Sequence, residues 1–291
     1  MNILHSLFKI IRPYNVFLSC MAIPIAFTVY SKESLLDWIQ INSNAKLFYN
    51  GFLLVFFYTS AANTINDVFD IKTDKINRPN RPLASNQLER KHGIVFFIFL
   101  IICGIYCSTQ TNTSTFYFSN LIILPFILLY TPVFKNIPIL GNLIVSFILA
   151  SVFLFVQLLM IEKISDYLLF ALAFSFSSIR EMGKDMADIN GDKSMKIMTF
   201  AVVYGLQKSM YCIYFFMLLT ILVSITTFII NGFNFLYLTT LIITVYTPLF
   251  ISIFSLQKTL TIQSANQFSK TTKAITVMGM LTVLLLDIKL F

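Results

Sequence analysis

Charged residues are scarce in this sequence. Only 12% of its 291 residues are Asp, Glu, Lys or Arg, whereas 57% are hydrophobic. A soluble domain carries roughly a quarter charged residues. A chain of this length cannot bury so much apolar surface in one globular core, so the composition excludes an ordinary soluble domain and predicts a polytopic membrane protein.

Cysteine is scarce too, and no two of the four cysteines form a CxxC pair. All of them lie within apolar runs, so we expect them to pack as small hydrophobic residues rather than to form disulfides or bind metal. His5 and His92 belong to no visible Ser-His-Asp or Cys-His arrangement. The first apolar stretch resembles a signal peptide but lacks a small-residue cleavage site, so we expect it to be retained as a first span.

Apolar stretches near twenty residues long recur along the whole chain. The nine candidates are residues 13–31, 46–67, 92–109, 115–132, 139–161, 166–184, 208–230, 233–256 and 272–290. The sequence therefore predicts an all-α protein with nine transmembrane helices.

The net charge of +8 would suggest a nucleic-acid partner in a soluble protein. Here, however, 17 Lys and Arg residues fall at the N-terminus and around the even-numbered connections, against four on the opposite side. Cytoplasmic loops of membrane proteins are enriched in Lys and Arg. We therefore expect a multi-pass protein of the cell (inner) membrane, with a cytoplasmic N-terminus, an external C-terminus and no nucleic-acid partner.

The segment FYTSAANTINDVFDIKTDKINRPNRPLAS begins as the end of the second apolar run and then becomes polar. Asn66, Asp70 and Asp74 follow one another at intervals of four residues, and Asp67 lies at the edge of the row. This interval places side chains on one face of a helix. The segment therefore predicts a row of oxygen ligands at the cytoplasmic end of a span.

A second acidic segment, SIREMGKDMADINGDKSMK, ends the sixth apolar run. Its acids are spaced along one helix face, and they are Glu181, Asp185, Asp188 and Asp192. Because both segments end even-numbered spans, they lie on the same side of the membrane. We expect the two rows to face each other.

Rows of carboxylates beside lipid repel one another and need cations nearby. Mg²⁺ prefers hard oxygen ligands and completes its shell with phosphate oxygens and water. Two facing rows therefore suit Mg²⁺ ions around a diphosphate, with basic residues neutralising the remaining charge. The basic residues at the rim are Arg78, Arg81, Arg180 and Lys184. The alternative is a solvated loop whose acids are balanced by neighbouring Lys and Arg residues.

These residues resemble the signatures of the UbiA superfamily of intramembrane prenyltransferases. The first signature, NxxxDxxxD, is matched by Asn66, Asp70 and Asp74 and is followed by NRPNRPLAS. The second, DxxxD, is matched by Asp188 and Asp192. The segments IRPYN in the first span and YTPVFKNIPILGN before the fifth are similar to the family as well.

The resemblance covers nearly the whole chain and implies a fold and an activity. We expect residues 1–291 to form one UbiA-like domain, with nine helices around a central cavity and a cytoplasmic cap. The implied reaction is the Mg²⁺-dependent transfer of a polyprenyl group from an allylic polyprenyl diphosphate to a lipophilic acceptor within membrane lipid. Mg²⁺ and cationic side chains would stabilise the leaving diphosphate.

The resemblance also implies roles for individual residues. The expected metal ligands and their helpers are Asn66, Asp67, Asp70, Asp74, Asp185, Asp188 and Asp192. The expected diphosphate-binding residues are Arg78, Arg81, Lys135, Arg180 and Lys184. Tyr130 would lie near the reacting carbon and join Asp70, Asp74, Asp188 and Asp192 as catalytic residues. Arg12 and Asn15 would either contact the acceptor or anchor the first span.

The acceptor is less constrained than the reaction. REMGKDMADINGDK and the LGN after Lys135 are most similar to the digeranylgeranylglyceryl phosphate synthase-like branch, in which a glyceryl hydroxyl is alkylated; there the acceptor would be geranylgeranylglyceryl phosphate. MTFAVVYG, however, stands where the family usually has a Thr-Leu-Pro-like run. Aromatic acceptors (4-hydroxybenzoate, homogentisate or a naphthoate) and a chlorin ester therefore stay open.

Two other classes of membrane protein also use acidic residues. An ion-coupled transporter usually places them near the bilayer midplane, whereas here they lie at one end of the spans. A CDP-alcohol phosphotransferase needs a DGxxAR element, which this sequence lacks.

Overall fold

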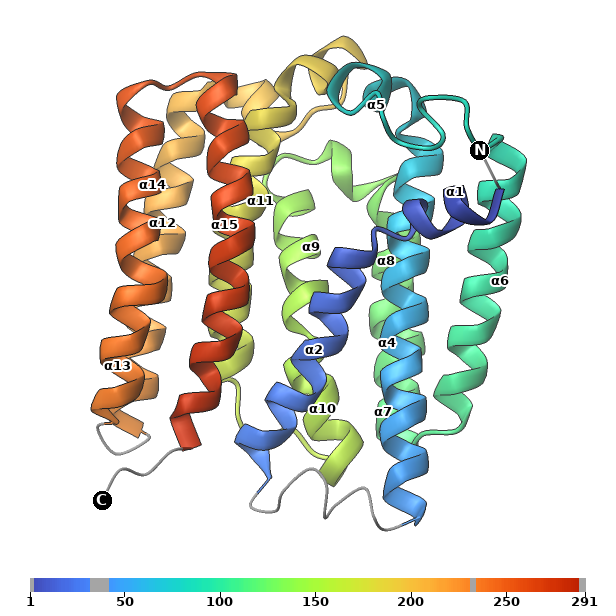
Figure 1. Ribbon diagram of the computed structural model, residues 1–291, viewed down its shortest axis with the longest axis vertical. Coiled ribbons are helices and arrows are strands. Elements are labelled where there is room, and N and C mark those ends of the chain that lie inside the picture. The colour runs from blue at the N-terminus through green and yellow to red at the C-terminus, as the bar shows by residue number, and fades with distance from the viewer. Residues whose placement is uncertain (1–2, 32–41, 231–233, 288–291) are drawn as a thin grey trace.

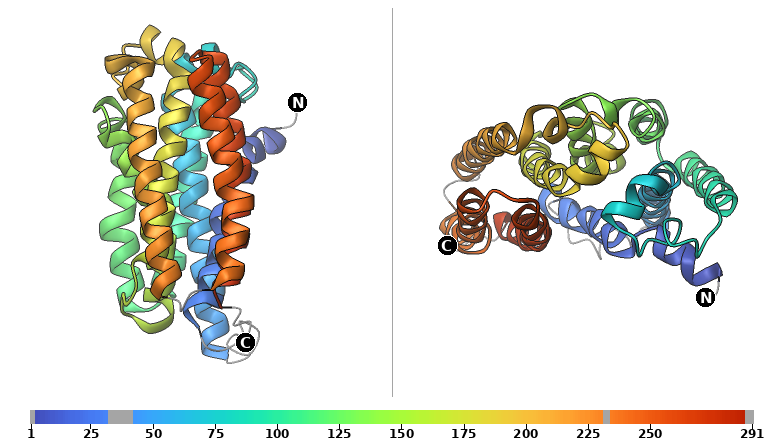
Figure 2. Two further views of the ribbon diagram at one scale, coloured as in Figure 1. Left: turned by 90° about the vertical axis from the view of Figure 1, so that its left-hand side faces the viewer. Right: turned by 90° about the horizontal axis from the view of Figure 1, so that it is seen from above.

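The computed structural model describes residues 3–31, 42–230 and 234–287. Within these ranges all regular structure is helical and no strand occurs. The long helices run side by side in one bundle (Figure 1), and the turned view in Figure 2 shows that they are nearly parallel. The all-α prediction is confirmed.

The first half of the chain forms the helices on one side of the bundle (Figure 1). They are α1 (Ile3–Ile10), α2 (Pro13–Tyr30), α4 (Asn42–Phe69), α5 (Ile71–Asn77), α6 (Arg90–Thr109) and α7 (Thr113–Tyr117), which continues through the π-helical η1 (Phe118–Ile123) into α8 (Leu124–Tyr130). The sequence did not predict α1 or α5. Both are too short for a membrane span, and α1 lies across the bundle axis.

The second half of the chain begins with the short 3₁₀ helix η2 (Phe134–Asn136) and continues through helices of varying length. They are α9 (Leu140–Ala150), α10 (Val152–Ile161), α11 (Leu168–Ser194), α12 (Phe200–Ile230), α13 (Phe235–Leu241), η3 (Ile242–Tyr246), α14 (Thr247–Lys258), α15 (Ile262–Val283) and η4 (Leu284–Asp287). The helix α12 is interrupted at Gly205, whose φ of 81° and ψ of 172° lie in a region open essentially only to glycine.

Six helical stretches of the described residues are long and apolar enough to cross a membrane. They are Pro13–Tyr30, Arg90–Thr109, Thr113–Tyr130, Leu140–Ile161, Phe200–Ile230 and Phe235–Lys258. Each coincides with a predicted span, and the chain is a multi-pass membrane protein.

The other three predicted spans fall on α4, α11 and α15, which carry more polar residues and fall below that apolar limit. The same three helices supply most of the site described below. The end of the span predicted at 272–290, the connection at 32–41 and the predicted external C-terminus lie outside the described residues, at least in part.

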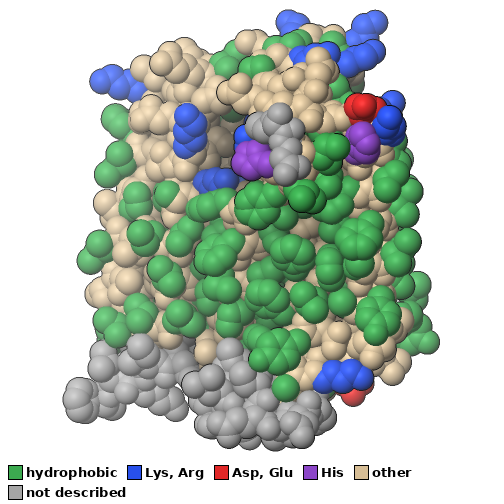
Figure 3. Space-filling view, turned by 45° about the vertical axis from the view of Figure 1, so that its right-hand side comes forward, with side chains coloured by type: hydrophobic (Ala, Val, Ile, Leu, Met, Phe, Trp, Pro, Cys, Tyr) green, Lys and Arg blue, Asp and Glu red, His purple; other side chains and the backbone are tan. Residues whose placement is uncertain are grey.

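The surface agrees with a lipid environment. Hydrophobic side chains cover the middle of the face shown in Figure 3, and charged side chains gather toward its two ends. Large side chains such as Phe215 and Phe254 are 62% and 68% exposed. A water-soluble protein rarely exposes so continuous an apolar surface, whereas lipid tails solvate it.

The contacts of α11 with four other helices determine the position of the site. This helix packs against α9, α12 and α15 along its length, and α5 packs against it near its C-terminal end. In Figure 1 that end lies at the top of the bundle, beside α5. The second acidic segment of the sequence therefore lies beside the first.

Candidate active site

The first acidic segment spans the junction of α4 and α5. The helix bends at Asp70, whose φ and ψ are −86° and 10°. The helical pattern of backbone bonds nevertheless continues, because the Asp70 N–H donates to the Asn66 carbonyl at 2.8 Å and the Asp74 N–H to the Asp70 carbonyl at 2.7 Å. The predicted row is therefore kept through the bend. The Asn66 side chain accepts a hydrogen bond from the Thr131 hydroxyl.

The second acidic segment is one continuous helix. The helix α11 extends ten residues beyond the predicted span end at 184, to Ser194, and carries all four acids. Asn77 of α5 donates to the Asp188 carbonyl at 3.0 Å and accepts from the Gly191 N–H at 3.1 Å. A Cβ atom at Gly191 would lie only 2.4 Å from the Asn77 amide nitrogen. Glycine at this position therefore lets α5 dock directly on α11.

Ion pairs join the two acidic segments to the basic residues around them. Arg78 donates to both carboxylate oxygens of Asp188, at 2.8 and 2.9 Å. Lys135, on η2, lies 2.6 Å from Asp70. The acids predicted to bind metal are thus paired with cations predicted to bind diphosphate.

Among the acids of the first segment, Asp67 is the most deeply buried. Its side chain is 2% exposed and accepts hydrogen bonds from Arg12 and, at 3.0 Å, from Arg81. Arg81 also pairs with Asp74 at 2.5 Å. The Asn63 side chain donates to the Ile11 carbonyl at 2.8 Å, so the IRPYN segment is fixed to α4 at two points.

Glu181 organises the basic residues farther down α11. It is 3% exposed and pairs with Arg180 at 2.7 Å and Lys184 at 2.8 Å. Asp185, one turn on, accepts a hydrogen bond from Asn142 at 2.8 Å. The sequence placed Glu181 in the acidic row and Asn142 in the LGN segment, but it indicated no role for either residue.

Lys135, which pairs with Asp70, also acts on a second carboxylate, that of Asp192. The charge of Lys135 acts on Asp192, and so do those of Asp188 and Asp70. Burial raises the pKa of Asp192 to about 6, and Lys135 opposes that rise. Burial likewise raises the pKa of Asp74, against the effect of Arg81. The neighbouring cations therefore compensate the negative charges of Asp192 and Asp74 only in part.

This donor set fits Mg²⁺. Asp70, Asp188 and Asp192 offer the hard carboxylate oxygens that Mg²⁺ prefers, and no ion pair is formed by Asp192 among the described residues. Within those residues no three acidic, His or Cys side chains are already drawn together as a ligand cluster. Lys135 and Arg78 occupy the carboxylates instead, so a metal would have to displace them.

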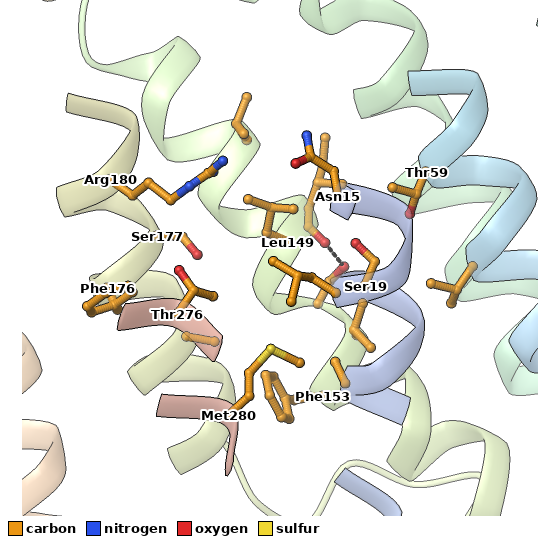
Figure 4. A pocket seen from close by; sticks show the side chains of 18 of the residues that line it. Asn15, Ser19, Thr59, Leu149, Phe153, Phe176, Ser177, Arg180, Thr276 and Met280 are labelled. Carbon is orange, nitrogen blue, oxygen red and sulfur yellow. Dashed lines mark hydrogen bonds between the residues drawn. The ribbon is translucent and has the colours of Figure 1, made fainter. Parts of the chain in front are cut away.

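A cavity of about 310 Å³ opens beside the ion pairs of Glu181, whereas Lys135, Asp70, Arg78 and Asp188 do not line it. Its polar rim includes Arg12, Asn15, Arg180 and Lys184. In Figure 4 Arg180 from α11 and Asn15 from α2 lie on opposite sides of the rim, and Phe153 and Met280 lie deeper. The site thus joins a charged entrance to an apolar interior.

Tyr130 lies where the charged and apolar parts meet. It lines the cavity, and the charges that act on it come from both acidic segments: Asp185, Glu181, Asp70 and Asp192. Every residue that the sequence predicted for the site therefore lies in or beside this one region. Asn15 lines the cavity without contacting an acid.

Known proteins share this sequence pattern. The model of the UbiA prenyltransferase family matches residues 16–272. A digeranylgeranylglyceryl phosphate synthase from Methanococcus aeolicus is 34% identical over 192 residues, which cover 66% of this chain and 67% of the relative.

Solved structures share the fold. A structure described as giving insights into digeranylgeranylglyceryl phosphate synthase in membranes has a TM-score of 0.69 at 27% identity and covers 98% of both chains. A UbiA homolog from Archaeoglobus fulgidus bound to GPP and Mg²⁺ has a TM-score of 0.68 at 15% identity, covering 96% of this chain and 99% of its own. The family match, the related sequence and the shared fold agree with the site geometry, and the chain belongs to the UbiA prenyltransferase family and is a membrane-embedded prenyltransferase.

Proposed function

We propose that this enzyme transfers a geranylgeranyl group from its diphosphate to the free glyceryl hydroxyl of geranylgeranylglyceryl phosphate, with Mg²⁺ as cofactor. The observation that carries the proposal is the docking of the two acidic segments through Asn77 and Arg78. The helices that carry these segments, α4 and α11, also line an apolar cavity, through Asn66, Arg180, Glu181 and Lys184. The relationship to digeranylgeranylglyceryl phosphate synthases supports the choice of acceptor.

Diphosphate binding would exchange the ion-pair partners. Lys135 and Arg78 now neutralise Asp70 and Asp188; with substrate they would turn to the phosphate oxygens, which basic side chains bind through charge-assisted hydrogen bonds. The carboxylates released would hold the metal, together with Asp74, Asp192 and Asn66. When bound, Mg²⁺ neutralises charge on the leaving diphosphate and so lowers the barrier to its departure.

The remaining polar residues would hold this arrangement in place. Asp67 fixes Arg12 and Arg81, and Glu181 fixes Arg180 and Lys184. Preorganised charges stabilise a transition state because no energy is spent in orienting them during the reaction. Asp185, held by Asn142, would add its charge to the same cluster.

The reaction breaks the bond between C1 of the prenyl chain and the diphosphate oxygen, and the bonding electrons leave with the diphosphate. A lone pair of the glyceryl oxygen then bonds to C1, and the hydroxyl releases its proton. Positive charge develops on C1, and the face of Tyr130 is suited to stabilise it. The apolar cavity would hold the prenyl tail and keep water from the cation.

The proposal includes an arrangement in the membrane. The helices α4, α11 and α15 would cross it together with the six apolar stretches, giving nine crossings around the cavity in a single domain. The helix α5 and residues 78–89 would form a cap on the cytoplasmic side, where the Lys and Arg residues are concentrated. The N-terminus would be cytoplasmic and the C-terminus external, in the cell (inner) membrane.

Product analysis tests the proposed function. Purified enzyme receives geranylgeranyl diphosphate and, separately, geranylgeranylglyceryl phosphate, 4-hydroxybenzoate, homogentisate or a naphthoate, and mass spectrometry identifies the lipids. We expect a product only with the glyceryl acceptor and only with Mg²⁺. Asp70→Ala should abolish it, while Glu89→Ala, at an exposed surface pair with Lys91, should leave it unchanged. Transfer to an aromatic acceptor instead would refute the assigned acceptor, and full activity of Asp70→Ala would refute the metal assignment.

A further inference from the structure

One basic residue of the site has no acidic partner. The cations Arg12, Arg78, Arg81, Lys135, Arg180 and Lys184 each form an ion pair with a carboxylate. Among the described residues, Lys273 of α15 forms none, although it is half-buried. A half-buried ammonium group loses hydration and is normally compensated by an anion.

Lys273 lies against α2, close to the cavity. Its ammonium group is 4.0 Å from the centre of the Tyr14 ring, and α15 packs directly against α2. Thr276, one turn farther along α15, lines the cavity together with Asn15 and Arg180 (Figure 4). Lys273 itself does not line the cavity, but it lies one turn before Thr276 and so beside the rim.

The charges that act on Lys273 are all positive. They belong to Arg180, Arg12 and Arg78. Arg12 and Arg180 each form an ion pair with a buried carboxylate. Lys273 lies on α15, which contains no Asp or Glu. The interaction with the Tyr14 ring compensates only part of this cost, because an exposed cation–π contact is weak. The rim thus has an excess of positive charge between α2, α11 and α15.

This excess lies on the α2 and α15 side of the Arg78–Asp188 pair. Lys135, which pairs with Asp70, is not among the charges that act on Lys273. Lys273, by contrast, contacts the Tyr14 ring one residue before Asn15, which the sequence analysis associated with the acceptor. Tyr14 is 43% exposed, so a lipid molecule can reach this part of the rim from the side of the bundle.

We infer that Lys273, with Arg180, binds the phosphate group of the acceptor lipid beside the rim between α2 and α15, and so selects acceptors that carry a phosphate. Arg180, which the family resemblance assigned to the diphosphate, would then serve the acceptor. Lysine binds phosphate as a point charge and arginine as a planar fork. With its phosphate held there, the acceptor would extend its glyceryl hydroxyl toward Tyr130. The aromatic acceptors of the family carry no phosphate for this pair to bind.

The inference rests on the proposed function, and a cycle of two enzymes and two acceptors tests it. Wild type and Lys273→Met are assayed with geranylgeranylglyceryl phosphate and with geranylgeranylglycerol, which lacks the phosphate. We expect Lys273→Met to raise the KM for the phosphate acceptor about tenfold or more, the size of one lost charge-assisted hydrogen bond. The KM for geranylgeranyl diphosphate, and the kinetics with geranylgeranylglycerol, should stay at the wild-type values.

Two further variants make the result specific. Lys273→Arg keeps the charge and should restore most of the affinity for the phosphate acceptor. Lys270→Met removes an exposed lysine one turn earlier on α15 and should change nothing. Thermal unfolding of every variant separates loss of binding from loss of folding.

Each alternative outcome has one meaning. An equal loss with both acceptors would make Lys273 structural, and a raised KM for geranylgeranyl diphosphate would assign it to the donor; either result overturns the inference alone. If wild-type enzyme transferred no prenyl group to the phosphate acceptor, the proposed function would fail as well.

Discussion

Burial separates two roles among the acids of the first segment. Asp67 is 2% exposed and held by two arginines, whereas Asp70 is 16% exposed and held by one lysine. A carboxylate enclosed by two guanidinium groups cannot readily turn to a metal, since both arginines would be left buried without a partner. The spacing of the sequence placed Asp67 at the edge of the row but could not reveal its partners, because Arg12 lies 55 positions away in the chain.

Asp67→Asn should therefore affect stability more than metal binding. Removing one partner of a buried ion pair costs about 3 kcal/mol, so we expect a lower Tm in detergent. The Mg²⁺ concentration for half-maximal activity should stay unchanged in the enzyme that remains folded. Asp188→Asn is the matched comparison, with a small change in Tm and loss of the Mg²⁺ response. A large shift in Mg²⁺ requirement for Asp67→Asn, without a change in Tm, would contradict this assignment.

The raised pKa of Asp192 predicts a pH dependence. Because its folded pKa of about 6 exceeds the value of an unfolded Asp, about 4, folding favours the protonated form. Without metal, this acid contributes stability at low pH that is lost as the pH rises from about 4 through 6. Metal binding has the opposite dependence, because Mg²⁺ needs the ionised carboxylate.

The test is a Mg²⁺ titration in the presence of geranylgeranyl diphosphate, followed by thermal shift from pH 8 to pH 5. We expect the half-saturating Mg²⁺ concentration to rise steeply below pH 6. In Asp192→Asn this increase should be smaller, because the titrating group is gone. A Mg²⁺ affinity that is independent of pH over this range would show that Asp192 stays ionised or binds no metal.

At the scale of elements, the site depends on how α5 docks against α11. The sequence predicted both acidic rows, because helical spacing is a local property. It did not predict α5 as a separate helix, nor Asn77 and Gly191 as its contact with α11. That contact joins residues 114 positions apart in the chain, and local spacing carries no information about such a distant partner.

Gly191→Ala should force α5 away from α11. The added methyl group would lie 2.4 Å from the Asn77 amide nitrogen, so Arg78 would be displaced from Asp188. We expect kcat/KM to fall about tenfold or more, since small displacements at an active site are costly, with helix content by circular dichroism unchanged. Lys193→Ala, an exposed change two residues away, should keep wild-type activity. Equal activity of the two variants would mean that this docking contact is dispensable.

At the scale of the whole molecule, polarity is arranged from end to end. The acidic segments, α5 and most Lys and Arg residues belong to one end of the bundle, and Lys163 lies in the connection at the other end. The predicted orientation follows from this asymmetry, whereas the nine spans were predicted from the length of the apolar runs. Six of the spans are helices that are long and apolar enough to cross a membrane. The other three, α4, α11 and α15, lie next to the polar site and have fewer apolar residues.

Cysteine labelling tests the orientation. In a background with the four native cysteines replaced by alanine, Lys193→Cys and Lys163→Cys each place a thiol in an exposed position. A membrane-impermeant maleimide should label Lys163→Cys in intact cells and Lys193→Cys only after the membrane is opened. Labelling of both from the same side would exclude an odd number of crossings between them, and the reverse pattern would invert the proposed topology.

The sequence by itself determined the membrane setting, the helical class and the two acidic rows, because apolar run length and helical spacing are local properties. It also indicated the family, since the motifs keep their order and spacing. Only the tertiary structure decided which acid pairs with which cation, that Glu181 holds two basic residues and that Lys273 has no acidic partner among the described residues. Those facts depend on which helices pack together and how deeply each side chain is buried, and packing brings together residues that are far apart in the chain.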